Sequence, residues 1–427
     1  MTLDRVVDPT RGDQARVDRT HGTATRLLAG LREGRPLTYQ EHRLLTGALP
    51  LPDLAWLISA TEAVSLRGRG GAAFPVAAKL AATPPGPATE IVVNGSESEP
   101  ASAKDRTLMW HAPHQAIDGA LAVAHALGTR QITIAVHDPT SATILRAACA
   151  ERTDAHAVRV TRIEGRFVSG EVRAMLNGLE GRAAVPAGRR VLPHVAGLSG
   201  QPTFASNVET FAQIGALVRL GVDAYAVPDS PAHVHEAGTS LLTLLGDVPT
   251  PGVVEAAHGV PLATLTGPLD GRPVLVGGYH GSWTTADDLT LDRDALRARR
   301  SPLGAGVIAV LPPGTCSLGE VTRVATWLAD QSARQCGPCL FGLHSVAEDL
   351  VGIHAGSGQR LHGLRSRLGL LPGRGACSHP DGASRFVATA LDAFAGEVDA
   401  HARGGGCGRP TLGVLPLDPL DLTGTPA

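Results

Sequence analysis

The stretch EIVVNGSESEP, residues 90–100, determines how the rest of the chain is interpreted. Its first half is a short run rich in β-branched residues and predicts a buried strand. Its second half supplies carboxylates and hydroxyls, which are suited to binding sugar-like hydroxyl groups. Ligands of open α/β sheets bind beyond the carboxyl ends of the strands. The stretch therefore predicts an α/β domain with a binding site just after Asn94.

Helix and strand patterns alternate after this strand. Helices are expected over residues 113–127 and 141–151, and strands over residues 131–136 and 158–163. Such an alternation is typical of a sheet layered with helices. We expect this α/β domain to occupy residues 61–230. Residues 1–60 are expected to form a loosely docked arm and short helices.

A second polar stretch, GRGGAAFP at residues 68–75, precedes the strand. Three glycines in four positions leave backbone N–H groups free to approach a phosphate. The only two lysines of the chain, Lys79 and Lys104, each follow one of the two stretches. The glycines also fit the dinucleotide pattern GxGxx[GA], but a helical segment rather than a strand comes before them. A simple surface turn therefore stays an alternative.

The second half of the chain has a different composition. A β-rich module is expected over residues 237–312, a helical region over 316–403 and a tail over 404–427. Five of the six cysteines follow residue 310, which indicates a metal or redox region rather than a disulfide framework. The pair in CGPC, residues 336–339, has the spacing of metal or cluster ligands, with zinc as the competing occupant.

Charge and hydropathy exclude two classes of partner. A net charge of −2 and a pI near 6.8 leave no broad basic surface for nucleic acid. The sequence has no run of about 18 apolar residues and no apolar leader near its start, so no direct membrane span is expected. The expected location is cytoplasmic.

Several motifs occur in one order along the chain. They are GRGGAxFP, NxxESEP, a Gly-Glu pair at a helix start, GxPT followed by NVET, GDVxxPGV and a late CxPC. In this order the chain resembles the NADH-binding flavoprotein subunit of respiratory complex I and the related diaphorase subunits of hydrogenases and formate dehydrogenases. The resemblance runs from about residue 25 to 400. It implies a Rossmann-like FMN-binding domain, a ubiquitin-like β-grasp module of the SLBB type, and a helical bundle with a [4Fe-4S] cluster.

The resemblance also assigns residues to the cofactors FMN and NADH. The FMN contacts fall on Gly68, Gly70, Gly71, Lys79, Asn94, Ser96, Glu97, Gly170, Glu171, Ser206, Asn207 and Thr210. The NADH contacts fall on Phe74, Glu99 and Phe167, and the neighbouring Arg69 and Ser98 complete the predicted cofactor-binding set. Glu97 and Glu171 are the expected catalytic residues, in the sense that they position and tune the flavin rather than transfer protons.

The chain departs from the family pattern at several of these positions. Ser96 stands in place of an aspartate, Phe167 of a tyrosine and Ser206 of an asparagine. Val172 stands in place of a second glutamate. The changes at Phe167 and Val172 remove polar groups that face the nucleotide.

The cysteines depart from the pattern as well. Cys336, Cys339 and Cys377 match three cluster ligands, whereas Ala333 replaces the first one. We expect Cys407 to be the fourth ligand, because its glycine-rich turn could fold back over the bundle. Cys149 and Cys316 are interpreted as ordinary thiols.

These assignments predict an electron-transfer flavoprotein subunit. It oxidises NADH through FMN and passes single electrons by way of the cluster to a ferredoxin-like or two-iron partner subunit. Two alternatives stay open. One is an iron–sulfur adaptor that no longer binds NADH, and the other is a structural subunit with a degenerate site that holds zinc or nothing.

Overall fold

The structure is a computed structural model, and it describes residues 26–32, 34–188, 191–226 and 235–419. Its N-terminal half is built on a parallel sheet with the strand order β3-β2-β1-β4. The strands are β1 (Glu90–Asn94), β2 (Gln131–Val136), β3 (Arg159–Arg162) and β4 (Thr203–Asn207). Residue Asn94 is paired with Ala135 on one side and Asn207 on the other, so the polar ends of β1 and β4 lie together.

Alternate residues of β1 face two different helix layers. Ile91 and Val93 pack into the main core beneath α5 and α8, whereas Val92 packs beside Met175 of α7. The helices of this half are α1 (Tyr39–Thr46), α2 (Leu54–Ala63), α3 (Val76–Ala82), α4 (Lys104–His111), α5 (Pro113–Ala126), α6 (Pro139–Ala150), α7 (Val172–Leu179) and α8 (Val208–Tyr225). The sheet is therefore covered on both faces, as the alternating pattern predicted.

A mixed five-stranded sheet follows, with the order β6-β5-β9-β7-β8. Its elements are β5 (Thr239–Gly246), β6 (Gly252–Ala257), α9 (Ala263–Thr266), β7 (Val274–Val276), β8 (Ser282–Thr284), α10 (Arg293–Ala298) and β9 (Val307–Val310). The first and last strands are parallel neighbours in the centre, and the other pairs are antiparallel. This arrangement is a β-grasp fold, and its assignment to the SLBB type stays a prediction.

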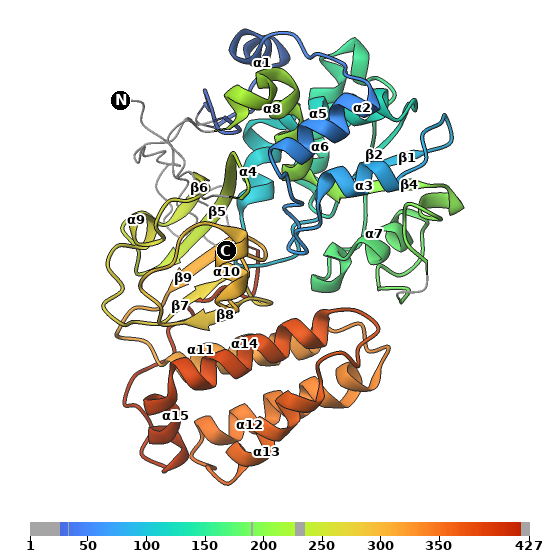
Figure 1. Cartoon of the computed structure of the whole chain (residues 1–427). Helices are drawn as coiled ribbons and strands as arrows, with labels where there is room; N and C mark the ends of the chain where they lie inside the picture. The colour runs from blue at the N-terminus through green and yellow to red at the C-terminus, as the bar shows by residue number, and fades with distance from the viewer. Residues whose placement is uncertain (1–25, 33, 189–190, 227–234, 420–427) are drawn as a thin grey trace.

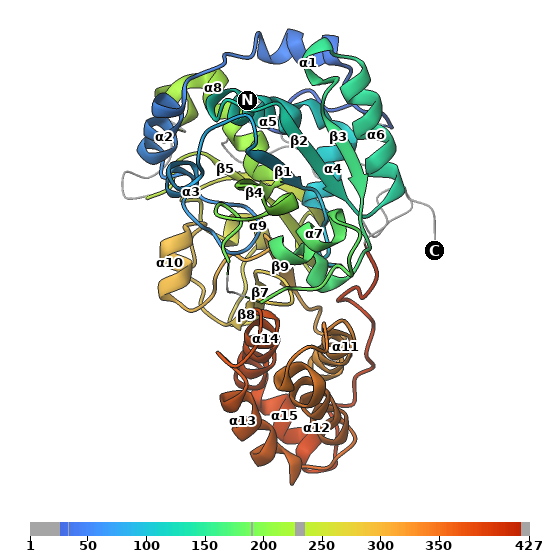
Figure 2. The same ribbon diagram turned by 90° about the vertical axis from the view of Figure 1, so that its right-hand side faces the viewer.

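The C-terminal region is a helical bundle at the end of the molecule opposite α1 (Figures 1 and 2). It contains α11 (Ser317–Asp330), a π-helical turn (Pro338–Leu343), α12 (His344–His354), α13 (Arg360–Leu370), α14 (His379–Ala393) and α15 (Ala395–Ala402). Helix α14 docks on the β-grasp module, where Thr389 Oγ1 accepts a hydrogen bond from the main-chain N–H of Trp283 at 3.0 Å. The module thus joins the bundle to the α/β half.

Some elements differ from the sequence prediction. Strand β4 occupies part of the Gly/Pro-rich segment before α8, where the sequence predicted no strand, and its backbone pairs with that of β1. The described part of the predicted tail is not free, since the N–H groups of Gly413 and Leu415 donate to the Glu320 carboxylate of α11. Of the arm and short helices predicted over residues 1–60, residues 1–25 and 33 lie outside the described residues. In the part of the chain that is described, no helix is long and apolar enough to cross a membrane.

Candidate functional site

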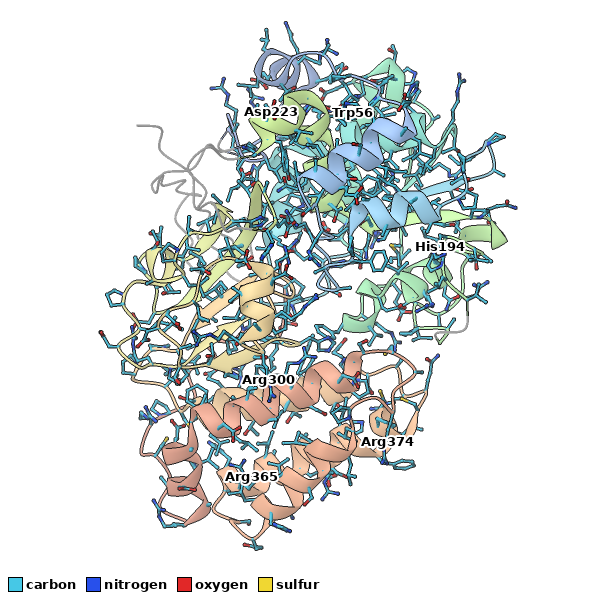
Figure 3. All side chains as sticks on the ribbon, in the orientation of Figure 1. Trp56, His194, Asp223, Arg300, Arg365 and Arg374 are labelled. Carbon is cyan, nitrogen blue, oxygen red and sulfur yellow. The ribbon has the colours of Figure 1, made fainter. Side chains whose placement is uncertain are left out.

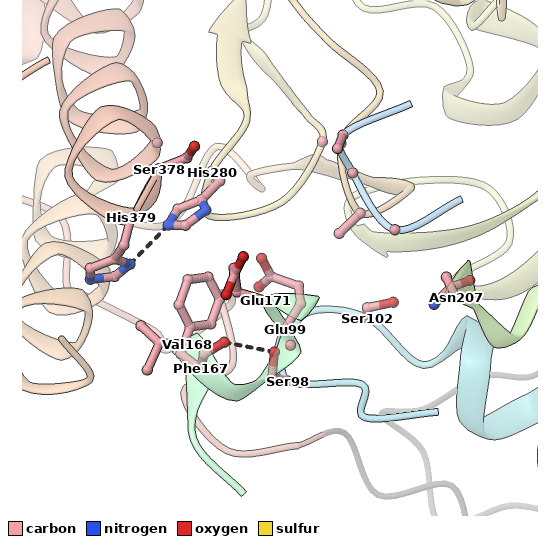
Figure 4. A pocket seen from close by; sticks show the side chains of 18 of the residues that line it. Ser98, Glu99, Ser102, Phe167, Val168, Glu171, Asn207, His280, Ser378 and His379 are labelled. Carbon is pink, nitrogen blue, oxygen red and sulfur yellow. Dashed lines mark hydrogen bonds between the residues drawn. The ribbon is translucent and has the colours of Figure 1, made fainter. Parts of the chain in front are cut away.

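One cavity of about 930 Å³ lies where the three parts of the chain meet. The α/β half contributes residues of the glycine stretch (residues 68–75) and of the acidic stretch that follows β1 (residues 95–100). The β-grasp module contributes Gly277 and Gly304, and the bundle contributes Cys377. Figure 4 shows Glu99 and Glu171 on one side of this space and Ser378 and His379 of the bundle on another. A cavity of this size accommodates a nucleotide-sized ligand.

Twelve of the seventeen predicted cofactor-binding residues line this cavity, which confirms that the two stretches converge. They are Arg69, Gly70, Gly71, Asn94, Ser96, Glu97, Ser98, Glu99, Phe167, Gly170, Glu171 and Asn207. Their individual contacts with FMN or NADH stay predictions.

The acidic stretch is held in place by side-chain bonds to the turn before α7. Asn94 Nδ2 donates to Gly170 O at 3.0 Å. Ser98 Oγ donates to Phe167 O at 2.8 Å, as drawn in Figure 4. A Cβ at Gly170 would lie only 2.4 Å from Ser98 Oγ and would displace this hydroxyl from Phe167 O. The end of β1 and the start of α7 therefore form one preorganised wall.

Glu97 acts as a cap for α4. Its carboxylate accepts hydrogen bonds from Ser102 Oγ at 2.6 Å and from the N–H groups of Asp105 and Arg106 at 2.9 and 3.0 Å. Burial alone would raise the pKa of Glu97, but the Arg106 guanidinium and these donors lower it below its ordinary value. Glu97 is therefore a fixed negative charge that also orders the start of α4.

Glu99, two residues further on, has the opposite electrostatics. It accepts a hydrogen bond from the Tyr279 N–H at 2.8 Å, and burial raises its pKa to about 8. The nearby negative charge of Glu97 contributes to this rise. Glu99 thus reaches from the α/β half to the β-grasp module as a carboxyl that stays largely protonated near neutral pH.

Glu171 caps the other helix of the site. Its carboxylate accepts hydrogen bonds from the N–H groups of Arg173 and Ala174 at 2.9 and 3.0 Å, which satisfies the first donors of α7. It also pairs with the Arg173 guanidinium at 3.3 Å. The carboxylate therefore has a structural duty beside its place on the cavity wall.

The glycine stretch forms a tight turn. Gly68 N–H donates to Phe74 O at 2.9 Å, and Gly71 has a φ of 89°, which favours glycine. Arg69 lies within this turn, where it is buried and paired with Glu236 and Glu209. Its N–H also donates to Thr210 Oγ1 at 2.9 Å. Arg69 thus fastens the turn to α8 and to the β-grasp module.

Five predicted residues do not line the cavity, namely Gly68, Phe74, Lys79, Ser206 and Thr210. The Lys79 ammonium instead donates to Ala205 O at 2.9 Å beneath β4, and burial lowers its pKa to about 8. The other lysine, Lys104, reaches the cavity but pairs with Asp105 and Glu209 at 2.8 and 2.7 Å. Both lysines are thus engaged within the protein.

Phe167 sits at the meeting point of the three parts. Its ring makes edge contacts with His280 of the module and with Trp327 and His379 of the bundle, at centroid distances of 4.7, 5.3 and 5.5 Å. A hydrogen bond of 3.0 Å joins His280 Nε2 and His379 Nδ1 (Figure 4). Phe167, His280 and His379 of this aromatic group line the cavity.

Sequence reasoning missed three arginines of the cavity that come from outside the α/β half. Arg297 and Arg300 come from the β-grasp module and Arg385 from α14, and all three line the space. Figure 3 shows Arg300 near the junction of the module and the bundle. These side chains lie far along the chain from the two polar stretches, and no motif marks them.

Three cysteines gather at the bundle end of the cavity. Cys336 and Cys339 flank the start of the π-helical turn, and Cys377 precedes α14. Burial, together with the neighbouring Cys336 and Cys377 thiols, raises the pKa of Cys339 to about 12. π-Helical segments often mark functional sites because they displace side chains from the regular helical positions. This group, called the three-cysteine corner below, provides the soft donors that iron–sulfur clusters require.

Cys407 does not join the three-cysteine corner, so its prediction as the fourth ligand is wrong. Cys407 Sγ lies within 4.8 Å of Sγ of Cys316, the residue that precedes α11. Cys336 lies beyond the opposite end of α11, whose 14 residues span about 21 Å. The glycine-rich turn does fold back, but onto the wrong end of the bundle for this role.

A nucleotide-sized cavity with a thiol corner on its wall is the site of a redox protein of the flavin and iron–sulfur class. Two family descriptions match the chain: the Nuo51 FMN-binding domain over residues 61–216, and the NADH-ubiquinone oxidoreductase-F iron-sulfur binding region over residues 320–401. Together they cover the part of the α/β half that bears both polar stretches and the part of the bundle that bears the corner.

Relatives extend this similarity over most of the chain. An NADH-quinone oxidoreductase F subunit of Rhizobium meliloti (strain 1021) is 32% identical over 375 residues, covering 81% of this chain and 88% of the relative. The corresponding protein of Streptomyces coelicolor is 31% identical over 399 residues, covering 86% of each chain. The chain therefore belongs to the family of NADH-quinone oxidoreductase F subunits.

Solved structures agree with this membership. A chain of the NAD+-reducing [NiFe]-hydrogenase in the H2-reduced state superposes with a TM-score of 0.71 at 25% identity. The match covers 82% of this chain but only 63% of the hydrogenase chain. The comparisons thus confirm the predicted family, the α/β fold class and an NADH-oxidising electron-transfer subunit with FMN and [4Fe-4S] regions.

Proposed function

We propose that this chain oxidises NADH at the cavity and delivers the electrons through the three-cysteine corner to a ferredoxin-like or two-iron partner subunit. One observation carries the proposal: the same cavity is lined by Gly70 and Asn94 at one side and by Cys377 at another. A flavin in this space and a cluster on these thiols would therefore share a wall.

The residues present fit both groups. The turn at Gly70 and Gly71 offers backbone N–H groups without Cβ atoms in front of them, which suits a phosphate. The thiolates of the corner suit iron. When bound, FMN accepts a hydride from NADH and releases single electrons, and a cluster carries them onward.

The chain's own contribution is positioning. Glu97 and Glu171 are held by helix N-termini and cannot swing away, so the wall keeps its shape when a ligand enters. Phe167 and its ring partners add a packed aromatic surface to the same wall. A rigid wall limits the reorganisation that accompanies electron transfer.

We propose that Arg297 and Arg300 bind the diphosphate of NADH. Arg297 and Arg300 are exposed at the edge of the cavity, and a guanidinium pairs well with phosphate oxygens. They supply charge on a nucleotide surface where Phe167 and Val172 have replaced polar residues of the family pattern.

Three thiolates hold three corners of a cubane and leave the fourth to another donor. Ser332 is buried next to Cys339, and its hydroxyl interacts with the Cys339 thiol. We propose that this hydroxyl lies near the iron of the cluster that Ala333 leaves without a thiolate ligand.

We also propose that the protein is cytoplasmic. NAD(H) is available there, and reduced thiols such as the six free cysteines persist.

The test uses the full-length protein, purified without oxygen. Its absorption spectrum should contain flavin bands and a broad iron–sulfur shoulder, and both should bleach on addition of NADH. Gly70→Val should lower FMN content severalfold, because a Cβ at this position would lie 3.3 Å from Asn207 Cβ and the larger valine side chain would fill the space in front of the turn.

Gly369→Val is the matched control, since this α13 position is exposed and a Cβ there meets nothing within 4 Å. Full flavin content in Gly70→Val would contradict our placement of FMN. A shoulder without flavin bands, or flavin that NADH does not bleach, would favour the adaptor alternative, for which Val172 and Phe167 are the motivating residues.

A further inference from the structure

A second group of ligand-type side chains lies at the opposite end of α11 from the three-cysteine corner. It consists of Cys316, Glu397, His401 and Cys407, whose ligand atoms all lie within 4.8 Å of one another. Cys316 Sγ is 3.2 Å from Glu397 Oε1 and 3.4 Å from His401 Nε2. Cys316 and His401 are buried, and the other two are half-buried.

Three separate segments deliver these side chains. Cys316 caps α11, and its Sγ accepts a hydrogen bond from the Gly319 N–H at 3.2 Å. Glu397 and His401 are four residues apart on α15 and therefore lie on one helix face. Cys407 lies in a turn whose flanking glycines, at positions 406 and 408, have positive φ.

The histidine is oriented as a metal ligand. His401 Nδ1 lies 2.9 Å from His354 O, a carbonyl that can only accept, so Nδ1 carries the proton. The lone pair of Nε2 consequently faces the thiols. A backbone carbonyl that fixes the tautomer in this way is a regular feature around ligating histidines.

The carboxylate is oriented as well. Glu397 Oε1 accepts a hydrogen bond from the Leu318 N–H at 2.9 Å, and Glu397 Oε2 pairs with Arg409. Arg409 follows Cys407 closely in the sequence, so the pair also holds the turn against α15. The donor set is thus preformed by contacts from several elements.

We propose that Cys316, Cys407, His401 and Glu397 bind one Zn²⁺ ion in a structural site. Two thiolates, one imidazole and one carboxylate match the soft and borderline donors that zinc prefers, in the four-coordinate number of its structural sites. Ligand atoms that all lie within 4.8 Å of one another suit a single ion in their midst.

The site has no part in electron delivery. None of its four residues lines the cavity, and the site and the three-cysteine corner lie at opposite ends of α11, a helix about 21 Å long. The site lies between the start of α11, helix α15 and the turn at Cys407. A bound metal would therefore link three segments of the bundle. The inference does not depend on the proposed function.

The experiment measures zinc and iron separately, by plasma mass spectrometry on full-length protein without an affinity tag. Wild type should contain one zinc ion per chain, and Cys316→Ser, Cys407→Ser and His401→Gln should each lose most of it while they keep iron. Cys149→Ser is the matched control, because it changes a buried cysteine of α6 outside both thiol groups. Cys336→Ser should lose iron and keep zinc.

Two measurements on wild type cover the case in which the variants do not fold. A chelator should release zinc and lower the melting temperature by several degrees, and added Zn²⁺ should restore it. Cobalt in place of zinc should show thiolate-to-metal charge-transfer bands. Folded wild type without zinc, iron bound in its place, or a disulfide between Cys316 and Cys407 in protein handled without oxygen would overturn the proposal.

Discussion

The two ends of α11 carry two groups of cysteines in contrasting surroundings. At the C-terminal end, the three-cysteine corner reaches the nucleotide-sized cavity through Cys377. At the N-terminal end, Cys316 and Cys407 are accompanied by an oriented imidazole and a carboxylate, away from the cavity. Position relative to the cavity, rather than the presence of thiols, therefore distinguishes the electron-transfer site that we propose at the corner from the structural site that we propose around Cys316.

The largest effect that tests this contrast is expected for Cys339→Ser. Removing one of three thiolates should abolish most of the bound iron, because too few soft donors remain. Flavin content and bleaching by NADH should persist, whereas reduction of a two-iron partner should be lost. Iron analysis and stopped-flow reduction of the partner measure these outcomes. Cys316→Ser serves as the comparison variant and should retain iron. Unchanged iron in Cys339→Ser would end the assignment of the corner.

Restoring a cysteine at position 333 should make the cluster of the three-cysteine corner more stable in air. Ala333→Cys supplies the thiolate that the family pattern has at this position, so we expect iron to be lost in air severalfold more slowly than from wild type. The half-life of the broad visible shoulder gives the rate. Ala55→Cys adds an exposed thiol on α2, away from the corner, and should leave the rate unchanged. Equal lifetimes in wild type and Ala333→Cys would mean that another donor already completes the cluster.

A smaller effect is expected at the cavity edge. Arg300→Ala should raise the KM for NADH about fivefold with little change in kcat, because an exposed charge contact contributes ~1 kcal/mol to binding. Steady-state reduction of ferricyanide measures both constants. Arg365→Ala is the control, since this exposed arginine of α13, labelled in Figure 3, lies on the bundle and pairs there with Asp392. An unchanged KM in Arg300→Ala would place the diphosphate elsewhere.

The sequence predicted what local patterns carry. Strands β1 and β2 were predicted at their observed bounds because β-branched runs mark them, and the Cys336/Cys339 pair was found because its ligands are close in sequence. Helix α4 was missed because its cap, Glu97, comes from outside the helix. The partner of Cys407 was missed for a similar reason: Cys316 is distant in sequence, and only the packing of α11 on α15 brings the two together.

The smallest effect distinguishes the two glutamates of the acidic stretch. Burial raises the pKa of Glu99 from 4.5 to about 8, so the folded protein binds a proton there that the unfolded chain releases. Glu99 therefore lowers stability increasingly as pH rises from about 4.5 to 8.

In flavin-free protein, Glu99→Gln should raise the melting temperature by a few degrees at pH 8 and by less at pH 5. Glu97→Gln is the opposite case, because Arg106 and backbone donors lower the pKa of Glu97, and it should destabilise the protein at neutral pH. Melting curves of both variants across this range measure the difference, and a shift of the same sign for the two would contradict the opposite electrostatics of their sites.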